Sequence, residues 1–210
     1  MLQMWRMLLL CAASLVTVPA ICQSADTQEM VRVLVAYHSL SGHTEKMADA
    51  VAQGARAVPG TQVILKRVGA VTSDELFSVD AIVLGSPVYW SNMAGEVKQF
   101  IDDWQFKFGV FPEFKLKNKV GAAFVTGGQI SSGKELTMLS ILAAMLGNYM
   151  VAVSGGGAFG ASATTEGNSP GIDEQELAGA RELGGRVAEV SAALKRGIAR
   201  HESRTGVSGP

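Results

Sequence analysis

A short, hydroxyl-rich turn follows the first apolar run of the sequence. Residues 31–38 read VRVLVAYH, and SLSGHT follows at residues 39–44. If the run is a strand and a helix begins after it, the free N–H groups of the first helical turn point into the turn. With the hydroxyls of Ser39, Ser41 and Thr44 they suit an anion, and the lack of a basic residue there favours a monophosphate. The alternative is a helix cap formed by Ser41 or Thr44.

A second turn with candidate ligand-binding residues follows the third apolar run. It reads PVYWSN at residues 87–92. Tyr89 and Trp90 are exposed by their position in such a loop, and large aromatic rings of this kind favour stacking against a planar ligand. The alternative is that both rings pack into the core or into an interface with another chain.

Two glycine-rich segments resemble nucleotide-binding motifs but fail the chemical test. GQISSGKE at residues 128–135 nearly spells a triphosphate-binding loop, but Glu135 replaces the hydroxyl that binds magnesium. GGGAFG at residues 155–160 matches a dinucleotide fingerprint, yet that motif works only after the first strand of a βαβ unit. Here it follows the last expected strand and precedes an irregular loop. We therefore expect 155–160 to pack close to a ligand or a neighbouring subunit.

Apolar runs alternate with helical periodicity along the chain, which is typical of βαβ units and a parallel sheet. Strands are expected at residues 31–37, 61–67, 80–85, 119–126 and 150–154. Apolar helical stripes include Met47, Ala50, Val51, Gly54 and Val58 in one segment and Leu136, Leu139, Leu142, Ala143 and Leu146 in another. The predicted fold class is α/β, a three-layer doubly wound five-stranded parallel sheet of order 2-1-3-4-5. Ligands then bind beyond the carboxyl ends of strands one and three.

Length and charge limit the possible functions. The chain has 210 residues and a formal net charge of -1, with 18 basic and 19 acidic side chains. This balance argues against nucleic-acid binding by bulk electrostatics and favours small-molecule chemistry. One domain is expected at residues 30–197, followed by a polar, frayed tail at 198–210.

The N-terminal segment is predicted to be a secretory signal peptide spanning residues 1–25. Arg6 precedes an apolar run that is short for a membrane span, and cleavage is expected after Ala20 or Ala25. The protein is then exported, periplasmic or secreted, without a stable membrane span after cleavage. The alternatives are a permanent anchor, a lipid-anchored Cys22, or translation from Met30, which makes the protein cytoplasmic.

The two cysteines, Cys11 and Cys22, both fall in this leader. The folded domain therefore has no cysteine pair. We expect neither a disulfide nor a cysteine-ligated metal in it, and no metal site is predicted.

Three segments taken together resemble a known family. They are SLSGHT after strand one, GSPVYWSNMAG after strand three and TGG at residues 126–128. The chain resembles the flavodoxin-like superfamily over residues 31–195, and within it the WrbA family of FMN-dependent NAD(P)H:quinone oxidoreductases. The resemblance implies the fold expected above and identifies the anion as the phosphate of FMN.

Carried over by position, the resemblance implies three cofactor-binding loops. The phosphate loop comprises Ser39, Leu40, Ser41, Gly42, His43 and Thr44. The loop lining the isoalloxazine comprises Pro87, Val88, Tyr89, Trp90, Ser91 and Asn92. The third loop comprises Thr126, Gly127 and Gly128, extends over residues 129–132 and closes over the ribityl chain. An aromatic that covers the active site is represented by Phe108, or else by Phe111.

The reaction implied by this resemblance is a ping-pong, two-electron reduction of a quinone by NADPH or NADH. The flavin carries the chemistry, so no protein residue is predicted to be catalytic, although His38, His43 and Tyr89 lie near enough to be tested. A homo-oligomer, dimer or tetramer, is also implied. A histidine pair of the family is missing from LAAMLGNYMV, before the fifth strand. The alternatives are a flavodoxin-type electron carrier, normally much more acidic, and a non-catalytic flavin-binding module.

Overall fold

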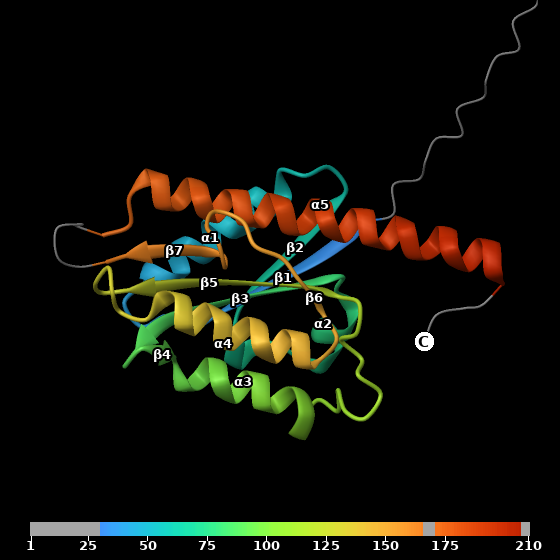
Figure 1. The fold of residues 1–210 in the computed structure, drawn as a ribbon, viewed down its shortest axis with the longest axis horizontal. Coiled ribbons are helices and arrows are strands. Elements are labelled where there is room, and N and C mark those ends of the chain that lie inside the picture. Colours follow the sequence, from blue (N-terminus) through green and yellow to red (C-terminus); the bar gives the residue numbers. More distant parts are fainter. Residues whose placement is uncertain (1–29, 166–170, 207–210) are drawn as a thin grey trace, which may run out of the picture.

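The computed structural model of the chain describes residues 30–165 and 171–206, so the predicted leader lies outside the described residues. A parallel sheet forms the middle layer (Figure 1). Its main strands are β1 (Val31–Tyr37), β2 (Thr61–Arg67), β3 (Ala81–Tyr89), β5 (Val120–Gly127) and β6 (Val151–Ala152). The order is β2-β1-β3-β5-β6. This confirms the predicted doubly wound 2-1-3-4-5 sheet, whose winding reverses between β1 and β3.

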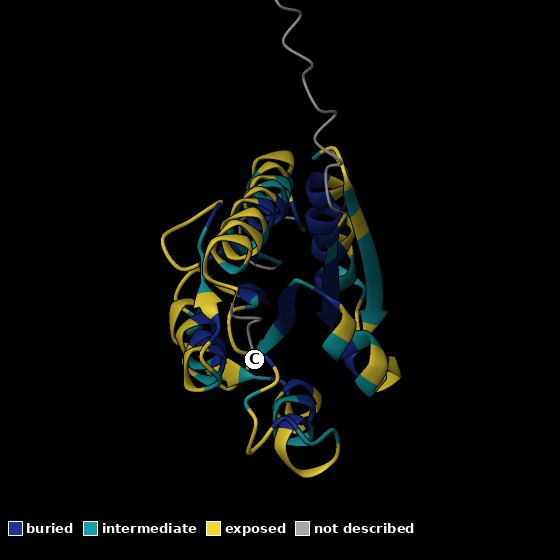
Figure 2. Cartoon of the chain, turned by 90° about the vertical axis from the view of Figure 1, so that its right-hand side faces the viewer, coloured by how far each residue is buried: buried dark blue, intermediate teal, exposed yellow. Residues whose placement is uncertain are grey.

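Helices cover both faces of the sheet. The helices α1 (His43–Arg56) and α5 (Glu174–Thr205) pack on one face. The other face carries the short turn η1 (Val68–Ala70), α2 (Ser73–Ser78), α3 (Gly95–Phe106) and α4 (Lys134–Gly147). Figure 2 shows buried residues on the strands and inner helix surfaces, with exposed residues on the outside. Each face thus has its own apolar core, as a three-layer fold requires.

The fifth strand position differs from the prediction. Instead of one strand at 150–154, β6 pairs with the start of β5, and a further strand, β7 (Ala161–Thr164), pairs with its end. The segment 155–160 was expected to follow the last strand. It lies instead between β6 and β7. Gly160 explains the local path, because its φ is 136° and an added Cβ would lie 2.0 Å from the Ala123 carbonyl oxygen. Only glycine fits so close to β5.

The buried face of α4 also differs from the prediction. Leu136, Leu139 and Leu146 of the expected core stripe are between 43% and 56% exposed. Leu142 of that stripe is buried as expected, but Ala143 is exposed, and the other buried residues of the helix include Thr137, Met138, Ile141 and Met145. Since α4 is apolar on nearly all sides, its periodicity does not single out one face.

The C-terminal helix continues beyond the predicted domain end. Helix α5 runs to Thr205 and is followed by Gly206 in the left-handed region, so residues 198–205 are helical rather than frayed. At its start Asp173 and Glu176 form a reciprocal capping box. The polar 198–205 segment contains no proline to end the helix, and Gly206 supplies the termination signal.

Helices α1 and α5 approach closely because two glycines meet at their contact. A Cβ on Gly184 would lie 1.9 Å from the Val51 carbonyl oxygen. A Cβ on Gly54 would lie 1.9 Å from the Arg181 carbonyl oxygen. The two helices therefore pack backbone to backbone along the C-terminal half of α1.

We expect Gly184→Ala to lower the free energy of unfolding by about 2–3 kcal/mol, since the added methyl forces the helices apart. The matched control is Gly185→Ala, where the nearest atom, the Gly54 carbonyl oxygen, lies 3.7 Å from an added Cβ. That change is expected to stabilise by up to about 1 kcal/mol through helix propensity. Urea denaturation of both variants measures the difference, and equal stabilities would contradict the close helix contact.

Candidate functional site

The first loop leaves the N-terminus of α1 open. Gly42, with φ at 86°, precedes the helix, and no side chain caps it. The buried Ser39 shapes the turn, because its Oγ accepts a hydrogen bond of 3.1 Å from the Gly42 N–H. Ser41 Oγ lies 3.0 Å from His43 Nδ1, and it accepts no capping hydrogen bond from a backbone N–H of α1. The capping alternative is therefore wrong, and the first N–H groups of α1 remain available to an anion.

Thr44 links the first loop to the third. Its side chain is buried, and its Oγ1 lies 2.8 Å from Thr126 Oγ1 at the end of β5. The two hydroxyls share one hydrogen bond, so they fix the start of α1 against the central sheet. Thr44 thus positions the loop, and the exposed Ser41 is the hydroxyl at its surface.

Arg67 at the end of β2 is a site residue that the sequence analysis missed. Its Nη1 donates a 2.5 Å hydrogen bond to the Ser39 carbonyl oxygen, and its Nη2 donates to Glu45 Oε2 at 2.9 Å. The Tyr37 hydroxyl also donates to Glu45, at 2.6 Å. Burial and this hydrogen bond raise the pKa of Tyr37 to about 12. The 2-1-3 strand order was the available signal, because it places the end of β2 beside the end of β1.

The second loop is a tight hairpin rather than an irregular loop. Strand β3 continues to Tyr89 and pairs with β4 (Asn92–Met93), so Trp90 and Ser91 form a two-residue turn. Their φ angles are 50° and 61°. Such turns favour Asn-Gly, and a non-glycine residue in this region costs about 1–3 kcal/mol. The Trp90 side chain is nevertheless fully exposed, which excludes the core-packing alternative for it.

The hairpin is anchored at its base. Ser86, buried in β3, accepts a 2.9 Å hydrogen bond from the Ala94 N–H and donates one of 2.8 Å to the Pro87 carbonyl oxygen. Pro87 and Val88 lie in β3 before the turn, and the Asn92 Oδ1 accepts from the Met93 N–H at 2.8 Å. Tyr89 is partly exposed, and burial together with the Glu96 carboxylate raises its pKa. A neutral phenol therefore stands beside the exposed indole.

The third loop spans residues 128–133, because Thr126 and Gly127 lie inside β5 and only Gly128 of the expected triplet lies in the loop. The loop folds back on the sheet, since a Cβ on Gly127 would lie 2.1 Å from Ser132 Oγ. It also contacts the hairpin, where a Cβ on Gly133 would lie 2.8 Å from the Ser91 Cα. Among the described residues, the buried Ser132 Oγ has no hydrogen-bond partner. A buried hydroxyl without a partner is rare in proteins and is a feature that a bound ligand would explain.

The lysine of the apparent triphosphate loop points elsewhere. Lys134 is buried at the start of α4, and its Nζ donates a 2.5 Å hydrogen bond to Thr164 Oγ1 in β7. The ammonium is thus bound to the neighbouring strand. Within residues 30–165 and 171–206, no group of three or more His, Cys, Asp and Glu side chains is arranged to hold a metal ion.

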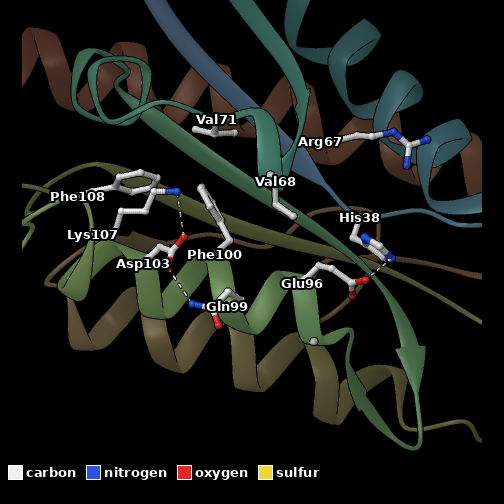
Figure 3. Close-up of a pocket in the computed structure, with 12 residues that line it drawn as sticks. His38, Arg67, Val68, Val71, Glu96, Gln99, Phe100, Asp103, Lys107 and Phe108 are labelled. Atoms are coloured by element: carbon white, nitrogen blue, oxygen red, sulfur yellow. Dashed lines mark hydrogen bonds and ion pairs between the residues drawn. The ribbon is translucent and has the colours of Figure 1, made fainter.

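The phenylalanines expected to cover the site lie far from these loops within the chain. Phe108 follows α3, a 12-residue helix that begins beside the hairpin and spans about 18 Å. It lines a cavity of about 710 Å³ between η1 and α3 (Figure 3). Phe111 packs against Phe114, with ring centroids 5.7 Å apart, beyond the same end of α3. Neither ring covers the three loops of its own chain.

The three loops nonetheless meet at the carboxyl ends of β1, β3 and β5. Together they offer helix N–H groups, an unpartnered buried hydroxyl and an exposed indole. These groups fit a phosphate ester that carries a planar ring.

None of the described helices has both the length and the hydropathy of a membrane-spanning segment.

Comparisons with known proteins agree with this geometry. A model of the flavodoxin domain matches residues 34–108. A protein of Geotalea uraniireducens named NAD(P)H dehydrogenase (quinone) is 35% identical, and the match covers 79% of this chain and 100% of the relative. NAD(P)H dehydrogenase (quinone) 3 of Rhizobium meliloti is 36% identical, and the match covers 80% of this chain and 95% of the relative.

Solved structures support the same assignment. A flavodoxin, WrbA-like protein from Agrobacterium tumefaciens superposes with a TM-score of 0.67 at 27% identity, covering 78% of this chain and 98% of that one. An archaeal flavodoxin, with a TM-score of 0.60 and 23% identity, shares the fold and covers 77% of this chain and 99% of its own. The chain belongs to the flavodoxin-like NAD(P)H dehydrogenase (quinone) family.

Proposed function

We propose that the protein binds FMN and catalyses the two-electron reduction of quinones by NADH or NADPH. The observation that carries this proposal is the meeting of the three loops around the uncapped N-terminus of α1. The names of the relatives supply the reaction, and the flavodoxin domain match favours a flavin. The small net charge of -1 favours a small-molecule enzyme over an acidic carrier that docks on protein partners.

Each loop has a separate task in this proposal. The first N–H groups of α1 and the Ser41 hydroxyl bind the phosphate, while Arg67 holds the loop through the Ser39 carbonyl. Trp90 and Tyr89 flank the ring system, and Ser132 Oγ provides a hydrogen bond to the cofactor. A bound flavin supplies the hydride and electron chemistry. The chain has to orient the ring and keep one face open to donor and acceptor in turn.

The test is steady-state oxidation of NADH and of NADPH by the purified protein supplied with FMN, with and without a benzoquinone. We expect quinone-dependent turnover well above that of free FMN, and parallel double-reciprocal lines that indicate a ping-pong mechanism. Oxidation no faster than with free FMN would overturn the enzymatic proposal. Comparing the two nicotinamides identifies the preferred donor.

We also propose that the protein forms a homo-oligomer, through the exposed apolar side of α4. Leu136, Leu139 and Leu146 lie on this side, and Ile130 and Trp90 are exposed near its N-terminal end. An apolar surface of this kind marks protein contacts. Light scattering on the same purified sample gives the molar mass, and a monomer would contradict this proposal.

A further inference from the structure

We propose that the cavity between η1 and α3 binds the apolar side chain of a neutral quinone. This cavity is called the α3 groove below. The inference rests on the proposed function, because it names the kind of acceptor that the same site uses. The α3 groove shares none of its lining residues with the three cofactor loops, yet His38 directly precedes the first loop and Gly95 lies three residues after the end of the second loop.

The α3 groove has an apolar floor. Val68, Val71 and Phe100 line it, and all three side chains are buried in the apolar core. Phe108 closes the far end, with its ring edge-on to Phe100 at a centroid distance of 6.2 Å (Figure 3). Along α3, the stretch from Glu96 to Asp103 gives the groove a length of about 10 Å. Such a channel suits an extended aliphatic or isoprenoid chain.

The charges at the rim favour a neutral occupant. Glu96 and Asp103 are balanced by Arg67 and Lys107, so the rim carries no net charge. Arg67 is already bound to Ser39 and Glu45, and Lys107 Nζ lies 3.7 Å from Asp103 Oδ2. No uncommitted cation is left in the rim for a diphosphate, and the carboxylates would repel one. A quinone carries no such charge, whereas a dinucleotide does.

The end next to the cofactor loops is polar. His38 Nε2 is buried there, without a hydrogen-bond partner among the described residues, and lies 3.6 Å from Glu96 Oε1. Figure 3 shows His38 and Glu96 facing each other at the opposite end of the groove from Phe108. An imidazole N–H there can donate to a ring oxygen of the quinone. We therefore expect the quinone ring to lie toward the cofactor loops and its apolar side chain to extend toward Phe108.

Gly69 provides a way to fill the groove without disturbing the fold. It lines the α3 groove, and a Cβ built on it meets nothing within 4 Å. Gly69→Phe therefore adds a large ring at the wall of the space proposed for the chain, with no clash at its Cβ. The control is Gly197→Phe, an equally open position on α5 that does not line the groove. Thermal melting should show that neither variant is less stable than the wild type, and Gly197→Phe is expected to melt at the same or a slightly higher temperature because it removes a glycine from the interior of α5.

The experiment compares two dimethoxy-methyl-benzoquinones that differ only in a decyl side chain. Each buried methylene strengthens binding about fourfold, so we expect the wild type to show at least a tenfold (about 1.4 kcal/mol) lower KM for the decyl quinone. Gly69→Phe should remove that difference and leave the KM of the chainless quinone unchanged. Gly197→Phe should keep the difference.

Equilibrium dialysis of the decyl quinone against the full-length protein separates the two proposals. If neither quinone is turned over but the decyl quinone binds and Gly69→Phe abolishes binding, the proposed reaction fails and the groove assignment stands. If both quinones are reduced with equal KM values, the groove assignment fails and the reaction stands. If Gly69→Phe raises only the KM for NADH, the groove assignment is also overturned, since the groove would then hold the electron donor.

Discussion

Ser41→Glu is expected to lower the affinity for FMN by about 100-fold or more without weakening the fold. Ser41 is exposed beside the open N-terminus of α1, and no helix N–H depends on its side chain. A carboxylate about 4 Å from a phosphate charge costs about 4 kcal/mol near a protein surface. The same carboxylate interacts favourably with the helix dipole by about 0.3–1 kcal/mol, so the free energy of unfolding should stay level or rise.

Quenching of FMN fluorescence measures the affinity, and urea denaturation of the cofactor-free protein measures the stability. The control is Ser41→Gln, which has the size of glutamate without its charge and should cost no more than about tenfold in affinity, since it removes one net hydrogen bond. If Ser41→Glu binds FMN as tightly as Ser41→Gln does, the anion site is not at this turn and the assignment of the first loop fails.

The fold was predictable because its signal is repeated along the chain. Alternation of apolar runs with helical stripes identified the first four strands within a few residues of their ends, and the strand order followed from the βαβ pattern. The first loop was predictable for the same reason. A turn directly after the first buried strand must lie at the switch point, whatever its sequence.

The remaining features depend on tertiary contacts that a linear pattern does not contain. The buried face of α4 is chosen by the sheet, because the helix offers apolar side chains on both sides. The split fifth strand depends on Gly160 passing within contact of Ala123. Arg67 belongs to the site only because the end of β2 lies against the first loop, and the buried, unpartnered state of the Ser132 hydroxyl depends on how the third loop folds back on the sheet. Single residues of this kind carry no periodicity.

The second large effect is expected at Trp90, where stability and binding should change in opposite directions. Trp90→Gly should raise the free energy of unfolding of the cofactor-free protein by about 1 kcal/mol, because glycine adopts a φ of 50° without strain. The indole is fully exposed, so its removal costs no packing. FMN affinity should fall about tenfold, since a stacked aromatic ring is worth about 1–3 kcal/mol.

Two further substitutions separate strain from stacking at this position. Trp90→Asn relieves the backbone, since asparagine tolerates the left-handed region, but removes the ring, and it should behave like Trp90→Gly. Trp90→Phe keeps both the strain and an aromatic ring, so it should keep wild-type stability and most of the affinity. Urea denaturation and FMN titration of the three variants provide the comparison. If FMN affinity is unchanged in all three while the molar mass falls, Trp90 serves the subunit interface, and the strained hairpin has no part in holding the flavin.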